Sequence, residues 1–213
     1  MNKNNRKEKT PTVKKEENAV ILDYLSRGYV KSDMSKFGGK AIAQAIGTEQ
    51  FTLLELAPKN GVDLEIQDTV YIGKGKRDKV YRVLGKLDFE NLTATSRIEL
   101  EYAIRDIVEA QEEKFVEFFN TAEALSTRLH KLELIPGIGK KYMWEIIEAR
   151  DEKPFESFKD ITERLPTLTD PAGMIVKRVQ QELDTTAPKR GKNKYNIFTQ
   201  PPRSQRRSPR KPR

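Results

Sequence analysis

The sequence predicts an α+β protein, in which a small N-terminal OB-like β-barrel is followed by an all-α helix-hairpin-helix domain and both termini are basic and disordered. Short apolar runs separated by turn residues fill residues 18–95, a pattern typical of strands. Apolar residues then recur at helical spacing. A tight turn with two glycines at 136–139 separates two apolar stretches. Together these observations favour a barrel followed by helices.

The composition limits the classes of protein to which the chain can belong. Its 213 residues, 36% hydrophobic and 34% charged, suffice for one or two small domains. Without cysteine and with His130 as its single histidine, the chain excludes disulfides and cysteine-based zinc sites. No apolar run reaches the length of a membrane span, and no signal-peptide core follows the basic N-terminus. We therefore expect a cytoplasmic protein without metal or cofactor.

The net charge of +8 comes from the termini. Residues 187–213 hold ten Lys or Arg and no acidic residue, residues 1–17 carry +3, and the middle of the chain carries −5. A segment so poor in apolar residues cannot bury enough of them to offset the entropy lost on ordering. We therefore expect disordered tails at 1–17 and 187–213. Within the C-terminal tail, Tyr195–Phe198 is a small apolar segment that could dock on another surface.

The C-terminal tail is expected to act as a basic arm that follows phosphates without recognising sequence. The alternative is a tail that only aids solubility. The basic residues at the end of the arm are Arg203, Arg206, Arg207, Arg210, Lys211 and Arg213.

Residues 18–95 are predicted to form the OB-like barrel, a shape often used to bind nucleic acid. Two strand-like runs, 41–47 and 50–56, flank a Gly-Thr-Glu connection as in a hairpin, and 68–73 and 79–87 flank a charged loop. Successive glycine amides and lysines in this loop suit an anion, but a solvated hairpin loop explains the sequence equally well. The candidate binding residues of the loop are Lys74, Gly75, Lys76, Arg77 and Lys79.

Residues 96–122 are predicted to form one long amphipathic helix that bridges the barrel and the helical domain. Ser96 and Glu99 have the spacing of a capping box at its start. Its aromatic residues Phe115, Phe118 and Phe119 recur at helical spacing, which is more typical of a core than of a base-stacking surface.

Residues 123–186 are predicted to form a tandem helix-hairpin-helix domain. An apolar helix ending near Leu134, the turn Pro136–Gly139 and a helix beginning at Lys140 match the motif in spacing. The glycines let a phosphate approach the main chain, and the N–H groups at the helix start carry the positive end of its dipole. We expect Ile138 and Trp144 to be packed in the core.

The candidate phosphate-binding residues of this first hairpin are Gly137, Ile138, Gly139, Lys140 and Lys141. A glycine-rich turn between packed helices can also be purely structural, and the two lysines at its mouth favour binding.

A second, degenerate hairpin follows about thirty residues later. Leu165–Asp170 aligns with the first turn, but threonines replace both glycines. We expect helices at 158–164, capped by Ser157, and at 171–183, opened by Asp170. Because the Asp170 carboxylate can occupy the N–H groups at the helix start, this copy should be structural, with Arg178 and its neighbour Lys177 as a possible basic flank.

Several segments resemble an uncharacterised, largely archaeal family whose domain has no known function. They are FTLLEL, VYIGKG, KFVEFFNTAE, TRLHKLELIPGIGKKYMWEIIEAR and PFESFKDI. The resemblance covers about 18–184 and is strongest over 115–161. It implies an OB-like barrel paired with tandem helix-hairpin-helix motifs and binding of RNA or another nucleic acid. Members are often encoded near translation and transcription genes, which favours RNA.

The function that we expect is therefore a non-enzymatic RNA-binding protein in ribosome maturation or translation, associated with ribosomal or other ribonucleoprotein particles and not with membranes. It would contact phosphates through the first hairpin and the barrel loop. There are two alternatives. One is a DNA-binding protein in repair or chromosome maintenance, and the other is a protein–protein scaffold. An enzyme is not expected, because acidic residues are spread along helical faces without the spacing of metal ligands.

Overall fold

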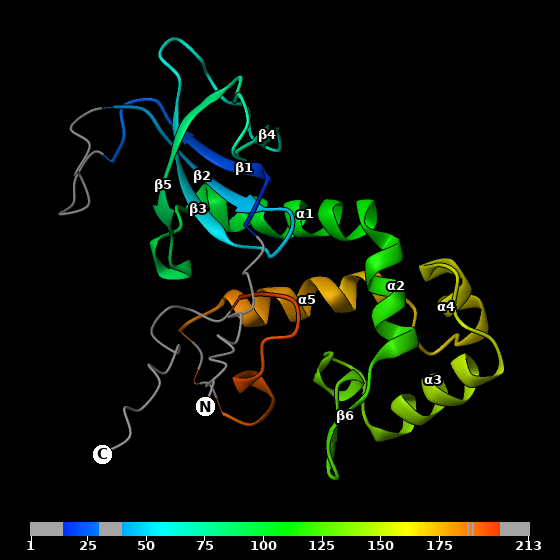
Figure 1. The fold of residues 1–213 in the computed structure, drawn as a ribbon. Coiled ribbons are helices and arrows are strands. Elements are labelled where there is room, and N and C mark those ends of the chain that lie inside the picture. The colour runs from blue at the N-terminus through cyan, green and yellow to red at the C-terminus, as the bar shows by residue number, and fades with distance from the viewer. Residues whose placement is uncertain (1–14, 30–39, 187, 189, 201–213) are drawn as a thin grey trace, which may run out of the picture.

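The computed structural model describes residues 15–29, 40–186, 188 and 190–200 (Figure 1). Its main sheet has five antiparallel strands in the order β4-β1-β2-β3-β5. These are β1 (Asn18–Leu25), β2 (Ile42–Gly47), β3 (Leu53–Pro58), β4 (Thr69–Tyr71) and β5 (Val80–Lys86). The predicted α+β class is confirmed, and so is the β2–β3 hairpin, in which Ala43 lies opposite Leu56.

The sheet is curled but not a closed barrel, because β4 and β5 form its opposite edges. The three residues of β4 pair with β1, and β5 pairs with β3. The charged loop between β4 and β5 therefore crosses from one edge of the sheet to the other. The sheet is therefore barrel-like, as predicted for residues 18–95, but the barrel is not closed, and the charged loop does not join two paired strands as a hairpin loop would.

The two faces of the sheet are both apolar, as the alternation of side chains along a strand requires when each face is covered. On β1, Val20 and Leu22 point into the larger core, which the helices share. Ala19 and Ile21 point to the other face, into a smaller cluster. Helix α1 (Ala94–Ala110) lies across the sheet on the side of the larger core (Figure 1).

The long helix predicted over 96–122 is in fact two helices. Helix α1 ends at Ala110 and α2 (Glu112–Thr121) starts after Gln111, where the chain changes direction (Figure 1). The Gln111 amide donates a hydrogen bond to the carbonyl of Thr48, 2.8 Å away, which fixes this corner against the sheet. The predicted capping box at Ser96 was also wrong, because Thr93 caps α1 by accepting the Ser96 N–H.

Phe115 and Phe119 are buried as predicted, and Phe115 packs against Phe51 after β2 with ring centroids 6.2 Å apart. The larger core runs without interruption from sheet residues such as Val20 to helix residues such as Val179. The sheet therefore fixes the position of the helices that follow.

The segment directly before the first glycine-rich turn is not the long apolar helix that was predicted. Residues 123–134 form a small hairpin of β6 (Ala124–Ser126) and β7 (Leu129–His130), followed by the short 3-10 helix η2 (Leu132–Leu134). The Ser126 hydroxyl accepts the Arg128 N–H at 3.3 Å, a local bond that favours a turn over a helix. His130 thus lies on a strand, where its Nδ1 accepts the Leu132 N–H.

The remaining elements follow the predicted order and include both predicted caps. They are α3 (Lys140–Glu152), α4 (Phe158–Arg164) and α5 (Pro171–Leu183), after which the 3-10 helix η3 (Gly191–Lys194) forms in a stretch that was predicted to be disordered. Ser157 accepts the Asp160 N–H at the start of α4, and Asp170 accepts the Gly173 N–H at the start of α5. These helix bounds agree with the sequence prediction.

Parts of both predicted tails are ordered. Near the N-terminus, the Glu16 carboxylate accepts N–H groups of the β2–β3 turn, including that of Glu49. Near the C-terminus, residues 190–200, hereafter the C-terminal segment, pack on α5 and α2. Phe198 lies with its ring centroid 5.0 Å from that of Phe118 and 5.5 Å from that of Phe115. The basic-arm residues 203–213 lie outside the described residues.

We predict that the C-terminal segment contributes to stability. Ending the chain after Thr186 would uncover Phe115 and Phe118 and should lower the free energy of unfolding by about 3 kcal/mol, the cost typical of losing a buried aromatic side chain. Ending it after Gln200 keeps the segment and serves as the control. Thermal melting of both truncated proteins tests this; an unchanged melting temperature for the shorter one would show that the segment contributes nothing.

Candidate nucleic-acid interface

The turn from Ile135 to Gly139 is closed by a hydrogen bond from the Ile138 N–H to the Ile135 carbonyl, 3.1 Å long. Gly137 has a φ of +90°, a backbone conformation that residues other than glycine rarely adopt. The turn places Ile138, 2% exposed, in the core, as predicted. The backbone on either side of Ile138 is consequently held at the surface.

Helix α3 begins at this surface without a side-chain cap. Gly139 is its N-cap residue and brings no side chain, so the first N–H groups of the helix face outward. A Cβ atom added to Gly139 would meet nothing within 4 Å, which shows that the space in front of the helix start is open. Lys140 and Lys141 are exposed beside it, and the Lys141 ammonium lies 3.8 Å from the Glu145 carboxylate.

The turn from Leu165 to Asp170 has the same hydrogen bond as the first and a different chemistry. The Leu168 N–H donates to the Leu165 carbonyl at 2.9 Å, and Leu168 is 1% exposed. The Asp170 carboxylate, however, accepts the Gly173 N–H at 2.8 Å and binds Arg105 at 2.9 Å. The start of α5 is thus already occupied by an anion of the chain itself, as the sequence predicted.

The electrostatics of Asp170 follow from these contacts. The hydrogen bond from Arg105 holds the pKa of the Asp170 carboxyl below its ordinary value, and the Gly173 N–H adds to this effect. Both partners stabilise the ionised carboxylate. At neutral pH an ionised carboxylate paired with Arg105 therefore occupies the start of α5, whereas two exposed lysines flank the start of α3.

Trp144 is 58% exposed, contrary to the prediction that it packs in the core. Helix α3 buries Met143 and Ile146, and this orientation turns Trp144 toward solvent. The helical spacing indicates that Trp144 is exposed, because it follows the charged Lys140 by four residues and therefore lies on the same face of the helix. The exposed indole consequently lies one turn from the open helix start.

A hollow of about 420 Å³ lies beside the first turn, between it, α5 and the C-terminal segment. The turn contributes the backbone around Gly137 and Gly139. Gln181 comes from α5, and Lys192 and Asn193 come from the C-terminal segment. Lys192 and Asn193 were not among the predicted site residues, because this part of the chain was expected to be disordered.

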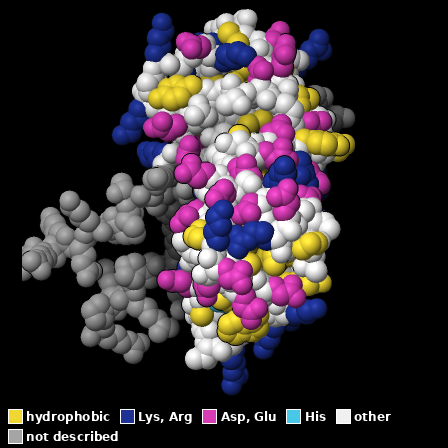
Figure 2. Space-filling model, turned by 90° about the vertical axis from the view of Figure 1, so that its right-hand side faces the viewer, with side chains coloured by type: hydrophobic (Ala, Val, Ile, Leu, Met, Phe, Trp, Pro, Cys, Tyr) yellow, Lys and Arg dark blue, Asp and Glu magenta, His cyan; other side chains and the backbone are white. Residues whose placement is uncertain are grey.

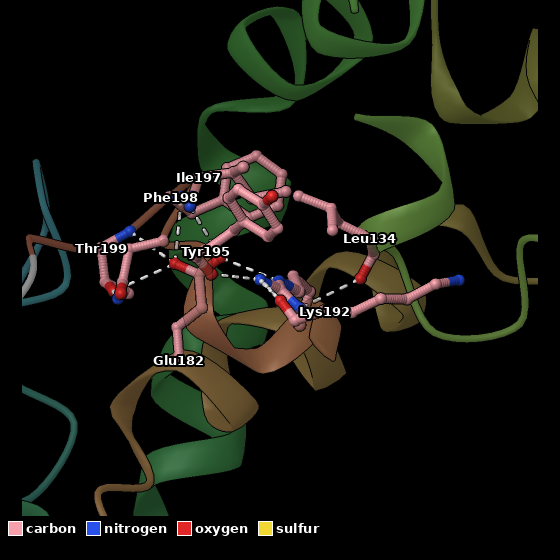
Figure 3. A network of polar contacts seen from close by, with 9 residues as sticks. Leu134, Glu182, Lys192, Tyr195, Ile197, Phe198 and Thr199 are labelled. Carbon is pink, nitrogen blue, oxygen red and sulfur yellow. Dashed lines mark hydrogen bonds and ion pairs between the residues drawn. The ribbon is translucent and has the colours of Figure 1, made fainter. Parts of the chain in front are cut away.

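Arg178 also lines this hollow. The sequence suggested that Arg178 and Lys177 form an exposed basic flank of the second hairpin, but Arg178 is buried. Its side chain is 1% exposed, and its Nε donates to Glu182 at 2.8 Å. It also donates to the carbonyls of Leu134 and Tyr195, so its charge is satisfied within the protein (Figure 3). Lys177, by contrast, is exposed.

The loop from Gly73 to Lys79 is largely bonded to itself and to its neighbours. Gly75 donates its N–H to the Tyr71 hydroxyl at 3.1 Å, Arg77 donates to the Gly73 carbonyl at 2.9 Å, and Lys79 pairs with Asp68. The Gly75 N–H, which was expected to bind an anion, therefore already has a hydrogen-bond partner within the protein. Lys74 and Lys76 remain exposed at the tip of the loop.

Charge is mixed over the face of the molecule formed by the ends of α1 and α2 and by α3 and α4 (Figure 2). Lys and Arg side chains alternate there with Asp and Glu, and hydrophobic side chains lie scattered between them. This face has no continuous basic field, so contact with a polyanion would have to be local. The open start of α3 is a local feature of this kind.

The described residues contain no group of three or more His, Cys, Asp or Glu side chains arranged to hold a metal ion. In that same part of the chain, no helix has the length and the apolar character that crossing a membrane would need.

The fold and the site define an α+β protein with a curled antiparallel sheet and a pair of related turns between helices. The family described as "Protein of unknown function (DUF655)" matches residues 15–200, and the chain belongs to this family. The uncharacterized protein MJ0038 of Methanocaldococcus jannaschii is 46% identical over 181 residues, which cover 84% of this chain and 78% of that protein.

The crystal structure of Af1531 from Archaeoglobus fulgidus, titled as a DUF655 family model, is similar in fold. It has 40% sequence identity to this chain and a TM-score of 0.77, and the match covers 87% of this chain and all of that one. The resemblance to an uncharacterised archaeal family is thereby confirmed.

We predict that Asp170→Ala lowers the free energy of unfolding at neutral pH by about 1 kcal/mol, the usual loss for a removed helix cap. Because the folded pKa of Asp170 is depressed, its contribution is complete above the unfolded pKa and disappears as the pH falls through the folded value. Urea unfolding at pH 7 and pH 3 checks this, with Thr169→Ala as a control. A loss that is equally large at both values would rule out the carboxylate as its cause.

Proposed function

We propose that this protein is a non-enzymatic RNA-binding protein that holds the phosphate backbone at Gly137–Lys141, and that it acts in ribosome maturation or translation. The observation that carries the proposal is the difference between two similar turns. The start of α5 is filled by Asp170, whereas the start of α3 has no side-chain cap and is flanked by Lys140 and Lys141. An open helix N-terminus beside two cations suits a phosphate.

We interpret the two turns as a tandem of helix-hairpin-helix motifs. Each turn is closed by the same hydrogen bond, buries one apolar residue and leads into a helix of 13 residues. In the first motif, η2 stands where the first helix is expected. The hairpin that leads into α3 would still present its backbone in the same way, because the turn itself is preserved.

Trp144 supports RNA over a DNA duplex. An exposed tryptophan offers a flat surface on which an unpaired base can stack, and sequence-tolerant binding of single strands combines such stacking with phosphate contacts. Trp144 lies one helical turn from Lys140, so a strand held at the start of α3 would bring a base within reach of the indole. In a duplex the bases are stacked on each other and cannot reach it.

Two further contacts would contribute only charge. Lys74 and Lys76 at the tip of the sheet loop are exposed, and we assign them a secondary, non-specific role. The same role falls to the basic residues beyond position 200. Since phosphate contacts position a strand without recognising bases, sequence preference would have to come from other surfaces.

We predict that Lys140→Ala together with Lys141→Ala weakens binding to a single-stranded RNA oligonucleotide. The slope of log K against log salt should become shallower by about 0.7 for each phosphate that the variant no longer binds. The fold should be unaffected, because both side chains are exposed. Fluorescence anisotropy of a labelled oligonucleotide at several salt concentrations measures the slope.

The matched control removes two other exposed lysines, Lys153 at the far end of α3 and Lys159 at the start of α4. It changes the net charge equally and should leave the slope close to that of the parent protein. Equal effects of the two double variants would contradict a site at the first turn. A larger effect on duplex DNA than on RNA would favour the DNA-binding alternative, and no binding of either would favour a scaffold.

A further inference from the structure

The C-terminal segment is held against α5 by one buried ion pair (Figure 3). The Glu182 carboxylate binds Arg178 and accepts the N–H groups of Ile197 at 2.9 Å, Phe198 at 3.1 Å and Thr199 at 2.9 Å. With its side chain 1% exposed, the carboxylate is shielded from water, and these bonds replace its hydration. The segment is therefore a fixed part of the protein surface.

The other end of the segment lies at the first turn. Lys192 donates from Nζ to the carbonyl of Glu133, 2.6 Å away, just before the turn begins. Arg178 donates to the carbonyl of Leu134 at 3.2 Å and also to that of Tyr195. The ion pair and Lys192 thus fix the spacing between the C-terminal segment and the turn.

The hollow between them is lined by the turn, by the acidic Glu133 just before it, by α5 and by the cationic Lys192 of the C-terminal segment. On one side lie the backbone atoms of the turn around Gly137 and Gly139, and on the other lie Lys192 and Asn193, with Gln181 between. The Lys192 ammonium uses one of its three N–H bonds on Glu133, which leaves donors for a ligand. The volume of about 420 Å³ falls in the range of small-ligand sites.

We propose that the C-terminal segment forms the second wall of the nucleic-acid site, and that the hollow receives one sugar-phosphate unit of a single-stranded RNA. This inference rests on the proposed function of the first turn. Lys192 contacts the phosphate next to the one held at the start of α3, and Asn193 and Gln181 bond the sugar hydroxyls. A base-paired strand is too rigid to place a nucleotide in the hollow, so the site selects unpaired RNA.

Lys192→Ala and Lys194→Ala form a matched pair, because both remove one exposed lysine from the same short helix. Lys192 lines the hollow, whereas Lys194 lies 4.9 Å from the centre of the Tyr195 ring. Against a uridine dodecamer, Lys192→Ala should flatten the salt slope by about 0.7, and Lys194→Ala should leave it unchanged. Equal slopes for the two variants would overturn the proposal.

Gln181→Glu tests the hollow without altering the C-terminal segment. Gln181 is exposed, so a carboxylate there should leave the melting temperature unchanged. It should weaken binding of the dodecamer about tenfold by repelling the phosphate, and an unchanged affinity would overturn the proposal. If Lys140→Ala with Lys141→Ala weakens binding but Lys192→Ala and Gln181→Glu do not, the first turn remains a site and the second wall is wrong. If none of them weakens binding, both proposals fail.

Discussion

The pairing of Arg178 with Glu182 is the interaction on which the arrangement around the first turn depends. Removing two charges from water is costly, and the cost is offset only where further hydrogen bonds satisfy them. Here the partners are carbonyls of the chain before the turn, such as that of Leu134, and N–H groups of the C-terminal segment. One ion pair on α5 thereby joins three parts of the chain that are far apart in sequence.

This connection gives the two similar turns different surroundings. The start of α5 faces Arg105 of α1 and is neutralised by Asp170, so it serves the packing of the helices. The start of α3 faces solvent, the hollow and the C-terminal segment. The first N–H groups of a helix are satisfied by side chains, by water or by ligands. At the start of α5 the Asp170 side chain is such a partner. At the start of α3 we propose that a phosphate of the nucleic acid takes this place.

Local patterns sufficed to predict the caps at Ser157 and Asp170 and the turn around Ile138, because each depends on a few neighbouring residues. Contacts between distant residues could not be predicted in this way. Gln111 divides a helix whose apolar spacing continues unbroken, since its amide meets the carbonyl of Thr48. The spacing of Arg178 and Glu182 is equally typical of an exposed pair on a helix. Nothing in their local sequence indicates that they are buried and order the C-terminal segment.

The substitution Gly139→Asp tests the central claim most directly, because it gives α3 the cap that Asp170 gives α5. A side chain at Gly139 meets no atom within 4 Å, and its φ of −91° suits an aspartate. We predict a free energy of unfolding that is unchanged or higher by roughly 0.3 kcal/mol, together with RNA binding weakened at least about tenfold because the carboxylate occupies the N–H groups and repels phosphate. Gly139→Asn, a cap without charge, should weaken binding less. A folded Gly139→Asp protein that binds RNA as tightly as the parent would contradict the account.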